Sequence, residues 1–479
     1  MLEFIRLSFI TAETNQWFVF QIYVIFVWAV MLPRMLFAGI FYWREKNKKI
    51  PKNHIPMDTT VVLTIYKEDP EILEECISRV NKELSGRDAK YSVVAIIDGW
   101  DDSKENMNLY EIAKRHSSLV LTTNARNKRK NLRAMFIEAR KHNILYETTI
   151  FLDSDTIPSN DETITQLLTP FSDPSIGGVT SAQLINNPKT LIQKISFWLE
   201  DARLNSSMAA ASLFGQVVCL PGRMYAVRTQ LVENRMDQLV NDSFSYFGFM
   251  KRACIAGDDR VLTNFVLRSG YKTVLAPKAK VTTYAPDTWN TTRKMWTRWG
   301  RTSQGYTLRS PWLLRYPFAF FLSWSDILLT IFTVYIVGIH WPYNIIFGSS
   351  DIAFIQAMLL AFLGMLMTMS IRQAPHLYQY KRDWKILPAF VLVVTLAQFI
   401  RLWSLLTQHK VGVWGSREGT ETLDKDDYVQ VVFKNITHLK VVISHATDNN
   451  RKTLPSEAAA VPNKTLPIEY NRLHSVQTQ

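Results

Sequence analysis

TVVLTIY (60–66) is a run of β-branched and apolar residues that stops at the charged triplet 67–69. Three similar runs follow along the chain, namely YSVVAII (91–97), LVLTT (119–123) and TTIFL (148–152). Segments with a helical pattern separate the runs, and this alternation is typical of βαβ units built around a parallel sheet. We therefore predict an α/β domain that starts at residue 59 and continues to about residue 183.

Charged side chains follow the strand-like runs. Glu68 comes after the first run, Asp98 after the second, and Asp153 and Asp155 directly after the fourth. Ligands of open parallel sheets bind at the carboxyl ends of the strands, so we expect these side chains to share a pocket. Two carboxylates such as Asp153 and Asp155, together with substrate phosphates, commonly bind Mg²⁺ or Mn²⁺. Taken alone, the DSD sequence would more often be a solvated acidic turn.

A basic triplet, Lys128, Arg129 and Lys130, opens the helix predicted after the third run. The start of a helix already carries the positive end of the helix dipole, so three cations there are electrostatically unfavourable. A bound anion would relieve that conflict, and helix starts commonly bind phosphate. The triplet therefore predicts contacts to a diphosphate.

A second acidic cluster, Gly257-Asp258-Asp259-Arg260, lies far along the chain from the first. Two adjacent carboxylates repel each other, which raises the pKa of one of them toward the value that a general base needs. The alternative interpretation is purely structural: the cluster would be a helix start with Asp as its cap and first-turn residue. The segment KMWTRWGR (294–301) is dense in Arg and Trp and suits either a functional amphipathic helix or an interfacial anchor.

Long apolar runs near the two ends of the chain indicate a membrane protein. Residues 17–43 contain a single charge, Arg34, and predict a transmembrane helix. A cleaved signal peptide is disfavoured because no basic segment precedes the run and no small-residue cleavage site follows it. Residues 327–347 and 352–371 carry no charge and predict a transmembrane hairpin.

Two further segments suit the membrane interface. Residues 311–324 mix Trp, Phe and Leu with Arg and Pro, which predicts an interfacial helix. The run 386–400 is short and ends at Arg401, so we expect residues 386–406 to be interfacial or re-entrant. After residue 419 the chain turns polar, and residues 428–433 and 439–445 are possible short strands within a peripheral tail.

The distribution of basic residues predicts the orientation. Four basic residues follow the first span, whereas the turn 348–351 has none, so the central domain is expected in the cytoplasm and the protein in the cell membrane. Four more place the loop after the hairpin on the same side. The two groups are Arg44, Lys46, Lys48 and Lys49, and Arg372, Lys381, Arg382 and Lys385.

The chain has a net charge of +13, from 55 Lys and Arg against 42 Asp and Glu. No groove-reading motif accompanies this charge, so we predict no nucleic-acid partner. Anionic lipid headgroups and the diphosphates of sugar nucleotides explain it more simply. The three cysteines, Cys76, Cys219 and Cys254, have no metal-ligand spacing and fit a reducing compartment.

Six short motifs, in their order along the chain, resemble the processive family 2 glycosyltransferases, a group that includes hyaluronan, chitin and cellulose synthases. The resemblance covers roughly residues 59–417 and is closest to hyaluronan synthases. Three features depart from the family pattern: Met295 replaces the Gln of QxxRW, CLPGRMY (219–225) is short, and one N-terminal span is evident where two are usual. The motifs are IYKEDP (65–70), IIDG (96–99), LDSDT (152–156), GDDRVLTN (257–264), TRW (297–299) and WGSR (414–417).

The resemblance implies a GT-A-like, nucleotide-sugar-binding domain joined to a transmembrane helical region with interfacial amphipathic helices. The implied activity is that of an inverting hexosyltransferase, which polymerises a UDP-sugar into a β-linked polysaccharide and extrudes it across the bilayer. Implied partners are the UDP-sugar donor, the growing polysaccharide and the lipid bilayer, and the implied cofactor is Mn²⁺ or Mg²⁺. In the family the WGSR loop is cytoplasmic, which requires an even number of crossings after the central domain.

The resemblance also assigns roles to residues. Asp259 would be the general base beside Asp258, Asp155 with Asp153 would hold the metal, and either Lys128 or Lys130 would meet the diphosphate. Tyr66 and Asp98 would lie near uracil, Arg298 would stabilise the departing UDP, and Trp299 would stack under the acceptor sugar. Further substrate contacts would come from Glu68, Gly222, Arg223, Arg260, Trp414 and Arg417.

The rival functions are a transferase that moves one sugar to a polyprenyl phosphate lipid and, from another class, a membrane transporter or an inactive binding protein. No motif identifies the sugar, so hyaluronan-like, chitin-like and glucan-like products stay open. The predicted parts are a segment 1–16, a transmembrane helix 17–43, a catalytic domain 44–308, a membrane region 309–413 and a tail 414–479.

Overall fold

The computed structural model describes residues 16–47, 57–246, 250–254, 256–347, 352–410 and 429–433. All of them belong to one compact unit, residues 1–445. Residues 446–479, the predicted strand 439–445, and Trp414 and Arg417 of the WGSR motif lie outside the described residues. The roles predicted for Trp414 and Arg417 therefore stay predictions.

Four parallel strands form the centre of the sheet, as predicted. They are β1 (Thr59–Ile65), β2 (Tyr91–Asp98), β3 (Leu119–Thr123) and β4 (Thr148–Asp153), and each bound agrees with the predicted run to within one residue. Strand β1 pairs in parallel with both β2 and β4, and β2 pairs in parallel with β3. The carboxyl ends of all four strands therefore lie along one edge of the sheet.

The complete sheet is mixed rather than purely parallel, and has the order β11-β3-β2-β1-β4-β7-β6-β10-β5. Strand β7 (Met224–Arg228) is antiparallel to β4 and to β6 (Ile176–Ile185). It brings the segment before it to the end of β4, where the Asp153 N–H donates to the Arg223 carbonyl at 2.9 Å. The remaining strands are β10 (Lys272–Thr283), parallel to β6, and β5 (Ile157–Pro158) and β11 (Val429–Phe433), antiparallel to β10 and β3.

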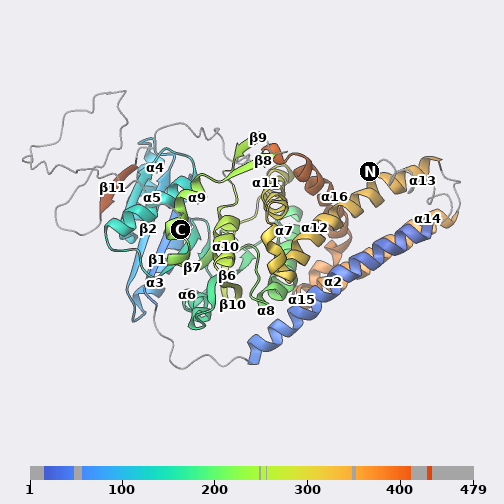
Figure 1. Ribbon diagram of the computed structural model, residues 1–479, viewed down its shortest axis with the longest axis horizontal. Coiled ribbons are helices and arrows are strands. Elements are labelled where there is room, and N and C mark those ends of the chain that lie inside the picture. The colour runs from blue at the N-terminus through green and yellow to red at the C-terminus, as the bar shows by residue number, and fades with distance from the viewer. Residues whose placement is uncertain are drawn as a thin grey trace, which may run out of the picture. The chain divides into compact units, whose positions relative to one another are not determined.

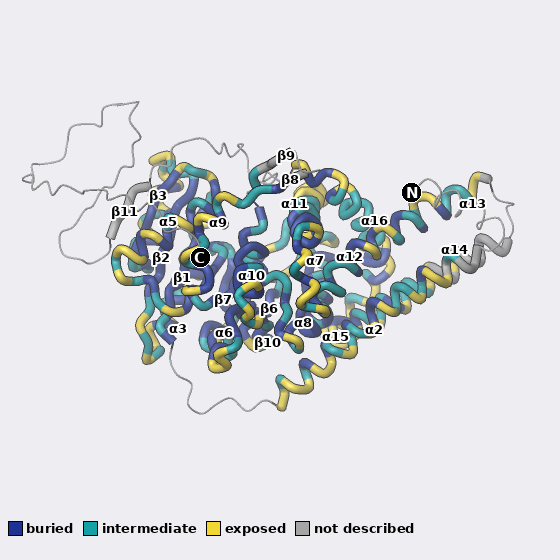
Figure 2. The backbone as a smooth tube through the Cα atoms, in the orientation of Figure 1, coloured by how far each residue is buried: buried dark blue, intermediate teal, exposed yellow. Residues whose placement is uncertain are grey.

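Helices cover both faces of the sheet, which explains why its strands are almost continuously apolar. Along β1, Val61, Leu63 and Ile65 belong to one core and Val62 to the other, because successive side chains point to opposite faces. Figure 2 shows the strands and the inner sides of these helices as buried. One core contains α3 (Pro70–Ser85), α4 (Lys104–His116) and α6 (Thr163–Leu168), and the other α5 (Lys128–Lys141), α8 (Ala209–Leu213) and α10 (Asp258–Arg268).

Long apolar helices pack together beside this domain (Figure 1). Three described segments are long and apolar enough to cross a membrane, Gln21–Asn47, Pro317–Tyr343 and Lys381–Leu406. Helix α14 has a further apolar segment, Phe362–Arg372. The helices are α2 (Gln16–Asn47), α12 (Pro317–Tyr335), which continues through a π-helical turn into α13 (Trp341–Phe347), α14 (Ile352–Arg372) and α16 (Leu387–Leu406).

One predicted boundary in this region differs from the structure. The expected interfacial helix 311–324 is a 3-10 turn (Pro311–Arg315) followed by the start of α12, with no break before the predicted span. The bounds of α16 agree with the predicted segment 386–406 to within one residue, and the helix continues through Arg401, where its apolar run ended. Both helices therefore contain a charged residue, and the structure pairs these two charges. The interfacial or re-entrant placement of 386–406 stays a prediction, although shortness no longer supports it.

One charged contact explains how both helices continue. Asp326 of α12 lies 2.8 Å from the Arg34 guanidinium of α2 and 3.6 Å from that of Arg401 of α16. Arg34 also donates to the Ser325 hydroxyl at 2.6 Å. An ionisable residue within an apolar helix is tolerated when it faces an oppositely charged partner in the helical bundle.

Helix α11 (Trp289–Leu308) connects the sheet domain to these helices. It lies so close to α16 that a Cβ on Gly300 would be 2.7 Å from the Ser404 hydroxyl. The TRW motif precedes this contact directly. Arg298 and Trp299 are thus held where the sheet domain meets the apolar helices.

Candidate active site

A single cavity of about 700 Å³ extends from the sheet edge to the apolar helices. Its lining at the sheet includes the turn after β4 and the segment before β7. Its middle includes the start of α10 and the Arg298–Trp299 part of α11, and its far end includes residues of α2, α12, α14 and α16. Segments far apart in sequence therefore share one solvent-accessible space.

Lys128 joins the two acidic clusters within this cavity. Its ammonium lies 2.7 Å from Asp153 Oδ1 and 3.5 Å from Asp258 Oδ2. Asn127 caps the helix that begins at Lys128, because its side-chain oxygen accepts the backbone N–H groups of the next turn. Burial by itself would lower the pKa of Lys128, but the two carboxylates raise it above the ordinary lysine value. Lys128 is therefore charged at neutral pH.

Asp155 is a buried carboxylate in an electrostatically unfavourable place. Burial, and then the neighbouring charge of Asp153, raise its pKa above the ordinary value, against smaller opposing effects of Arg223 and Lys128. A Cβ on Gly222 would lie 3.6 Å from Asp153 Oδ2, so the chain passes close to this pair. The predicted DSD turn is thus a wall of the cavity rather than a solvated surface turn.

The chemistry of these groups fits a divalent cation. No group of three His, Cys, Asp or Glu residues suited to a metal occurs among the described residues. Mg²⁺ usually takes one or two carboxylates and completes its shell with water and substrate phosphates. Asp153 and Asp155 supply that number, and a cation beside them would relieve the repulsion that raises the pKa of Asp155.

The Asp258-Asp259 pair starts helix α10, as the purely structural interpretation also predicted. Gly257 before it has φ of +80°, and a Cβ there would lie 3.2 Å from Thr302, so the position favours glycine. Burial alone would raise the pKa of Asp258, but Lys128 and Arg129 hold it below the ordinary value. Burial and the Asp258 charge raise the pKa of Asp259. Of these two carboxylates, Asp259 therefore has the raised pKa expected of a general base, and Asp258 does not.

Specific hydrogen bonds orient the Asp259 carboxylate. The backbone N–H of Arg260 donates to its Oδ1 at 2.8 Å, and the Cys219 thiol donates to its Oδ2 at 3.5 Å. Arg260 is only 6% exposed and lines the same cavity. The carboxylate thus faces the cavity in a fixed orientation.

Three more predicted substrate residues line the cavity. Arg223 lies 3.3 Å from both Glu200 Oε1 and Gln183 Oε1. Glu68 accepts the Ser154 hydroxyl at 2.8 Å, which ties the end of β1 to the DSD turn. Trp299 is 40% exposed, so its ring offers an apolar face to a ligand. The sugar contacts proposed for these residues stay predictions.

Other predicted residues lie outside the cavity lining. Strand β2 is on the far side of β1 from β4, so Asp98 is displaced from the DSD turn and instead accepts the Arg126 N–H at 2.7 Å. Tyr66 packs over Gly99, where a Cβ would lie 3.0 Å from its ring. Lys130 points away from Lys128 because helical residues two apart face different directions. The structure therefore selects Lys128, rather than Lys130, as the lysine of the cavity.

Arg129 does not face the cavity either, although the sequence grouped it with its neighbours. Its side chain is 1% exposed and is enclosed by protein groups. The diphosphate contact expected from the whole triplet therefore reduces to Lys128.

Sequence reasoning missed the charged residues at the far end of the cavity. Their signal was available, because an isolated charge within an apolar run requires a buried partner. The pairing itself was not available, since the partners lie on different helices. These residues are Arg34, Asp326, Arg372 and Arg401, and nearer the sheet Glu200 and Arg203 were missed as well.

The sequence is similar to those of known glycosyltransferases. The family described as glycosyltransferase-like family 2 matches residues 56–302. Hyaluronan synthase 2 of Rattus norvegicus is 27% identical over 329 residues, which cover 60% of this chain and 57% of that protein. An N-acetylglucosaminyltransferase of Rhizobium leguminosarum bv. viciae is 26% identical over 289 residues, covering 57% of this chain and 62% of that protein.

The chain spans less than two thirds of the length of these curated relatives. Among solved structures, a mannosyltransferase of Pyrobaculum calidifontis in complex with GDP-Man and Mn²⁺ is 17% identical, with a TM-score of 0.48. It covers 80% of this chain and 99% of its own.

Proposed function

Because the chain belongs to glycosyltransferase-like family 2, we propose that it is a processive polysaccharide synthase of the membrane that uses a UDP-sugar as donor. The predicted α/β domain is accordingly a GT-A-like glycosyltransferase domain. One observation carries the proposal: Lys128 contacts both Asp153 and Asp258, so the DSD turn and the GDDR helix form one site. A donor pocket and an acceptor base are thereby adjacent.

The donor is proposed to lie over the DSD turn. Lys128 binds the diphosphate, and Asp153 and Asp155 hold Mn²⁺ or Mg²⁺, which neutralises the leaving diphosphate when bound. Arg223 and the backbone at Gly222 form the adjoining wall. Tyr66 and Asp98 remain candidates for a uracil contact beyond the cavity lining.

Asp259 is proposed to take the proton of the acceptor hydroxyl while that oxygen attacks the anomeric carbon. A new C–O bond forms as the bond from the anomeric carbon to UDP breaks, and the anomeric configuration inverts. General-base help of this kind contributes about 10²- to 10⁴-fold in rate. Asp258 stays ionised beside Lys128, and Arg298 stabilises the departing UDP by an electrostatic effect worth about 3–4 kcal/mol for comparable donors.

The far end of the cavity supports a polymeric product. A hydrated chain needs a polar path through the hydrocarbon layer, and the cavity reaches residues of all four apolar helices. Arg34, Arg372 and Arg401 outnumber Asp326 there, which favours an acidic polymer among the open product classes. The catalytic domain is proposed to face the cytoplasm, as the basic loops indicate.

Membranes that contain the protein provide the decisive test. Each labelled UDP-sugar is supplied alone and in pairs, and the product is separated by size and by extraction into organic solvent. We expect a polymer, formed with a pair that includes an acidic sugar. A single sugar in the organic phase would support transfer to a polyprenyl phosphate instead. Absence of UDP release with every donor would refute the enzyme and leave a transporter or binding protein.

A further inference from the structure

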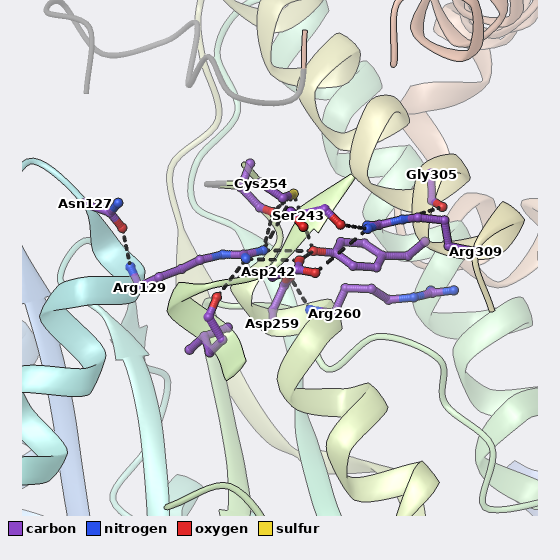
Figure 3. A network of polar contacts seen from close by, with 12 residues as sticks. Asn127, Arg129, Asp242, Ser243, Cys254, Asp259, Arg260, Gly305 and Arg309 are labelled. Carbon is purple, nitrogen blue, oxygen red and sulfur yellow. Dashed lines mark hydrogen bonds and ion pairs between the residues drawn. The ribbon is translucent and has the colours of Figure 1, made fainter. Parts of the chain in front are cut away.

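A buried polar network lies directly behind the proposed active site and supplies no group to its chemistry. It consists of side chains from four parts of the chain that converge on one guanidinium (Figure 3). Arg129, the group at its centre, is among the largest fully buried side chains of the protein. The members are Arg129, Asp242, Cys254, Tyr306 and Arg309.

Both terminal nitrogens of Arg129 contact protein groups, whereas its Nε has no hydrogen-bond partner among the described residues. One of its terminal nitrogens donates to the Leu239 carbonyl at 2.9 Å and lies 3.1 Å from Asp242 Oδ2. The other donates to the Ala256 carbonyl at 2.8 Å and to the Tyr306 hydroxyl at 2.9 Å. These contacts of the terminal nitrogens offset part of the cost of burying the guanidinium.

Tyr306 completes the network from helix α11. Its hydroxyl accepts from Arg129 and donates to Asp242. Burial raises the pKa of Tyr306 well above its ordinary value, so the hydroxyl keeps the proton that it donates. The Arg309 guanidinium stacks over the Tyr306 ring at 4.6 Å and donates to the Ser243 carbonyl at 2.7 Å.

The network contacts the three chain segments that carry the proposed reacting groups. Arg129 follows Lys128, the diphosphate lysine. Ala256 precedes Gly257 in the segment that leads to Asp259, and Tyr306 lies on the helix that carries Arg298. A Cβ on Gly257 would lie 3.3 Å from the Tyr306 ring, so these segments are also in close contact.

We propose that Arg129 and Tyr306 are positioning residues that hold the diphosphate lysine, the general base and the leaving-group arginine at the mutual distances that sugar transfer requires. This inference rests on the proposed function, because it assumes that Lys128, Asp259 and Arg298 act together. Apolar residues would stabilise such a core at least as well, since they carry no desolvation cost. The directional contacts of the network instead fix the orientation of three separate chain segments.

Tyr306→Phe tests the proposal with the least disturbance. The ring and its packing remain, whereas Arg129 and Asp242 each lose one hydrogen bond across to α11. A displacement of reacting groups by about 1 Å costs up to about 10²-fold in rate. We expect kcat to fall by about 10- to 100-fold, with KM for the UDP-sugar and the melting temperature close to wild type. Rates come from UDP release by purified protein.

Tyr42→Phe is the matched control. Its hydroxyl donates to Asn205 Oδ1 at 3.0 Å and touches no member of the network, so kcat should stay at the wild-type value. Asp242→Asn is the second variant: it keeps the shape but weakens both the Arg129 and the Tyr306 contact. It should show the same loss of kcat at unchanged KM.

The possible outcomes distinguish failure of the positioning role from failure of the proposed function. Wild-type kcat in both Tyr306→Phe and Asp242→Asn would overturn the positioning role, as would an equal loss in Tyr42→Phe. A loss that follows the melting temperature, with KM and kcat both changed, would also overturn it and leave a purely structural network. Failure of the wild-type protein to release UDP with any sugar nucleotide would instead refute the proposed function.

Discussion

The two ends of the cavity have opposite charge patterns. At the sheet end, Lys128 lies among the carboxylates of Asp153, Asp155, Asp258 and Asp259, and Arg223 and Arg260 also line this part of the cavity. At the far end, one carboxylate, Asp326, lies among Arg34, Arg372 and Arg401. The cluster around Lys128 thus consists of carboxylates, and the cluster around Asp326 consists of guanidinium groups.

The difference indicates two tasks. An acid-rich end with one lysine suits a metal-bound diphosphate, because the lysine and the metal both contact phosphate oxygens. An arginine-rich end within apolar helices offers hydrogen-bond donors to a passing chain, and its carboxylate, Asp326, is already paired with Arg34. The sheet end is therefore suited to chemistry, and the far end to holding the product.

The largest expected effect comes from the general base at the sheet end. Asp259→Asn keeps the shape but removes proton acceptance, so sugar transfer should fall by about 10²- to 10⁴-fold. UDP binding, measured by calorimetry, should persist because Lys128 is unchanged. Asp237→Asn, the same substitution at an exposed residue, is the control. Wild-type turnover in Asp259→Asn would contradict the assignment of the general base, and with it the assignment of the chemistry to the sheet end.

Metal removal should act on the sheet end alone. We expect EDTA to abolish activity and Mn²⁺ or Mg²⁺ to restore it, because the carboxylates there need a cation to hold a diphosphate. Asp155→Asn should weaken Mn²⁺ binding, measured by electron paramagnetic resonance without substrate. Full activity of the metal-free protein would contradict the assignment of Asp155.

A smaller effect is expected at the far end, on stability. Asp326→Asn leaves the Arg34 guanidinium without its carboxylate and should destabilise the protein by about 2 kcal/mol. The melting temperature in detergent provides the measurement. The matched control, Asp161→Asn, removes an exposed ion pair with Lys82 and should cost at most about 1 kcal/mol. Equal shifts in the two variants would mean that Asp326 is not the centre of its cluster.

The smallest effect is a displacement of the pH profile. Burial and the Asp258 charge raise the pKa of Asp259, so activity should be lost as the pH falls through a value above that of an ordinary aspartate. Asp258→Asn removes the repelling charge and should move this acid limb toward lower pH. kcat/KM measured across pH checks the direction, and a limb that moves upward would exclude Asp259 as the titrating group.

Much of the fold was predictable because its signals are local. The bounds of β1 to β4 follow from apolar runs that end at charges, and burial on both faces makes those runs continuous. The acidic turns at Asp153 and Asp258 were also predictable, since polar groups must follow buried strands or start helices. The boundary expected before the span at residue 327 was wrong, because α12 continues through Asp326, which contacts Arg34 and Arg401.

The sequence by itself determined the strands, the apolar helices and the chemical type of each cluster, because these depend on the period and polarity of neighbouring residues. Only the tertiary structure decided that Lys128 reaches both Asp153 and Asp258, that Arg129 turns inward to Tyr306, and that Asp326 meets Arg34. Apart from Lys128 and Asp153, which are 25 residues apart, these partners lie more than 100 residues apart along the chain, as the separation of 177 between Arg129 and Tyr306 illustrates. Local pattern carries no information about how such distant elements pack.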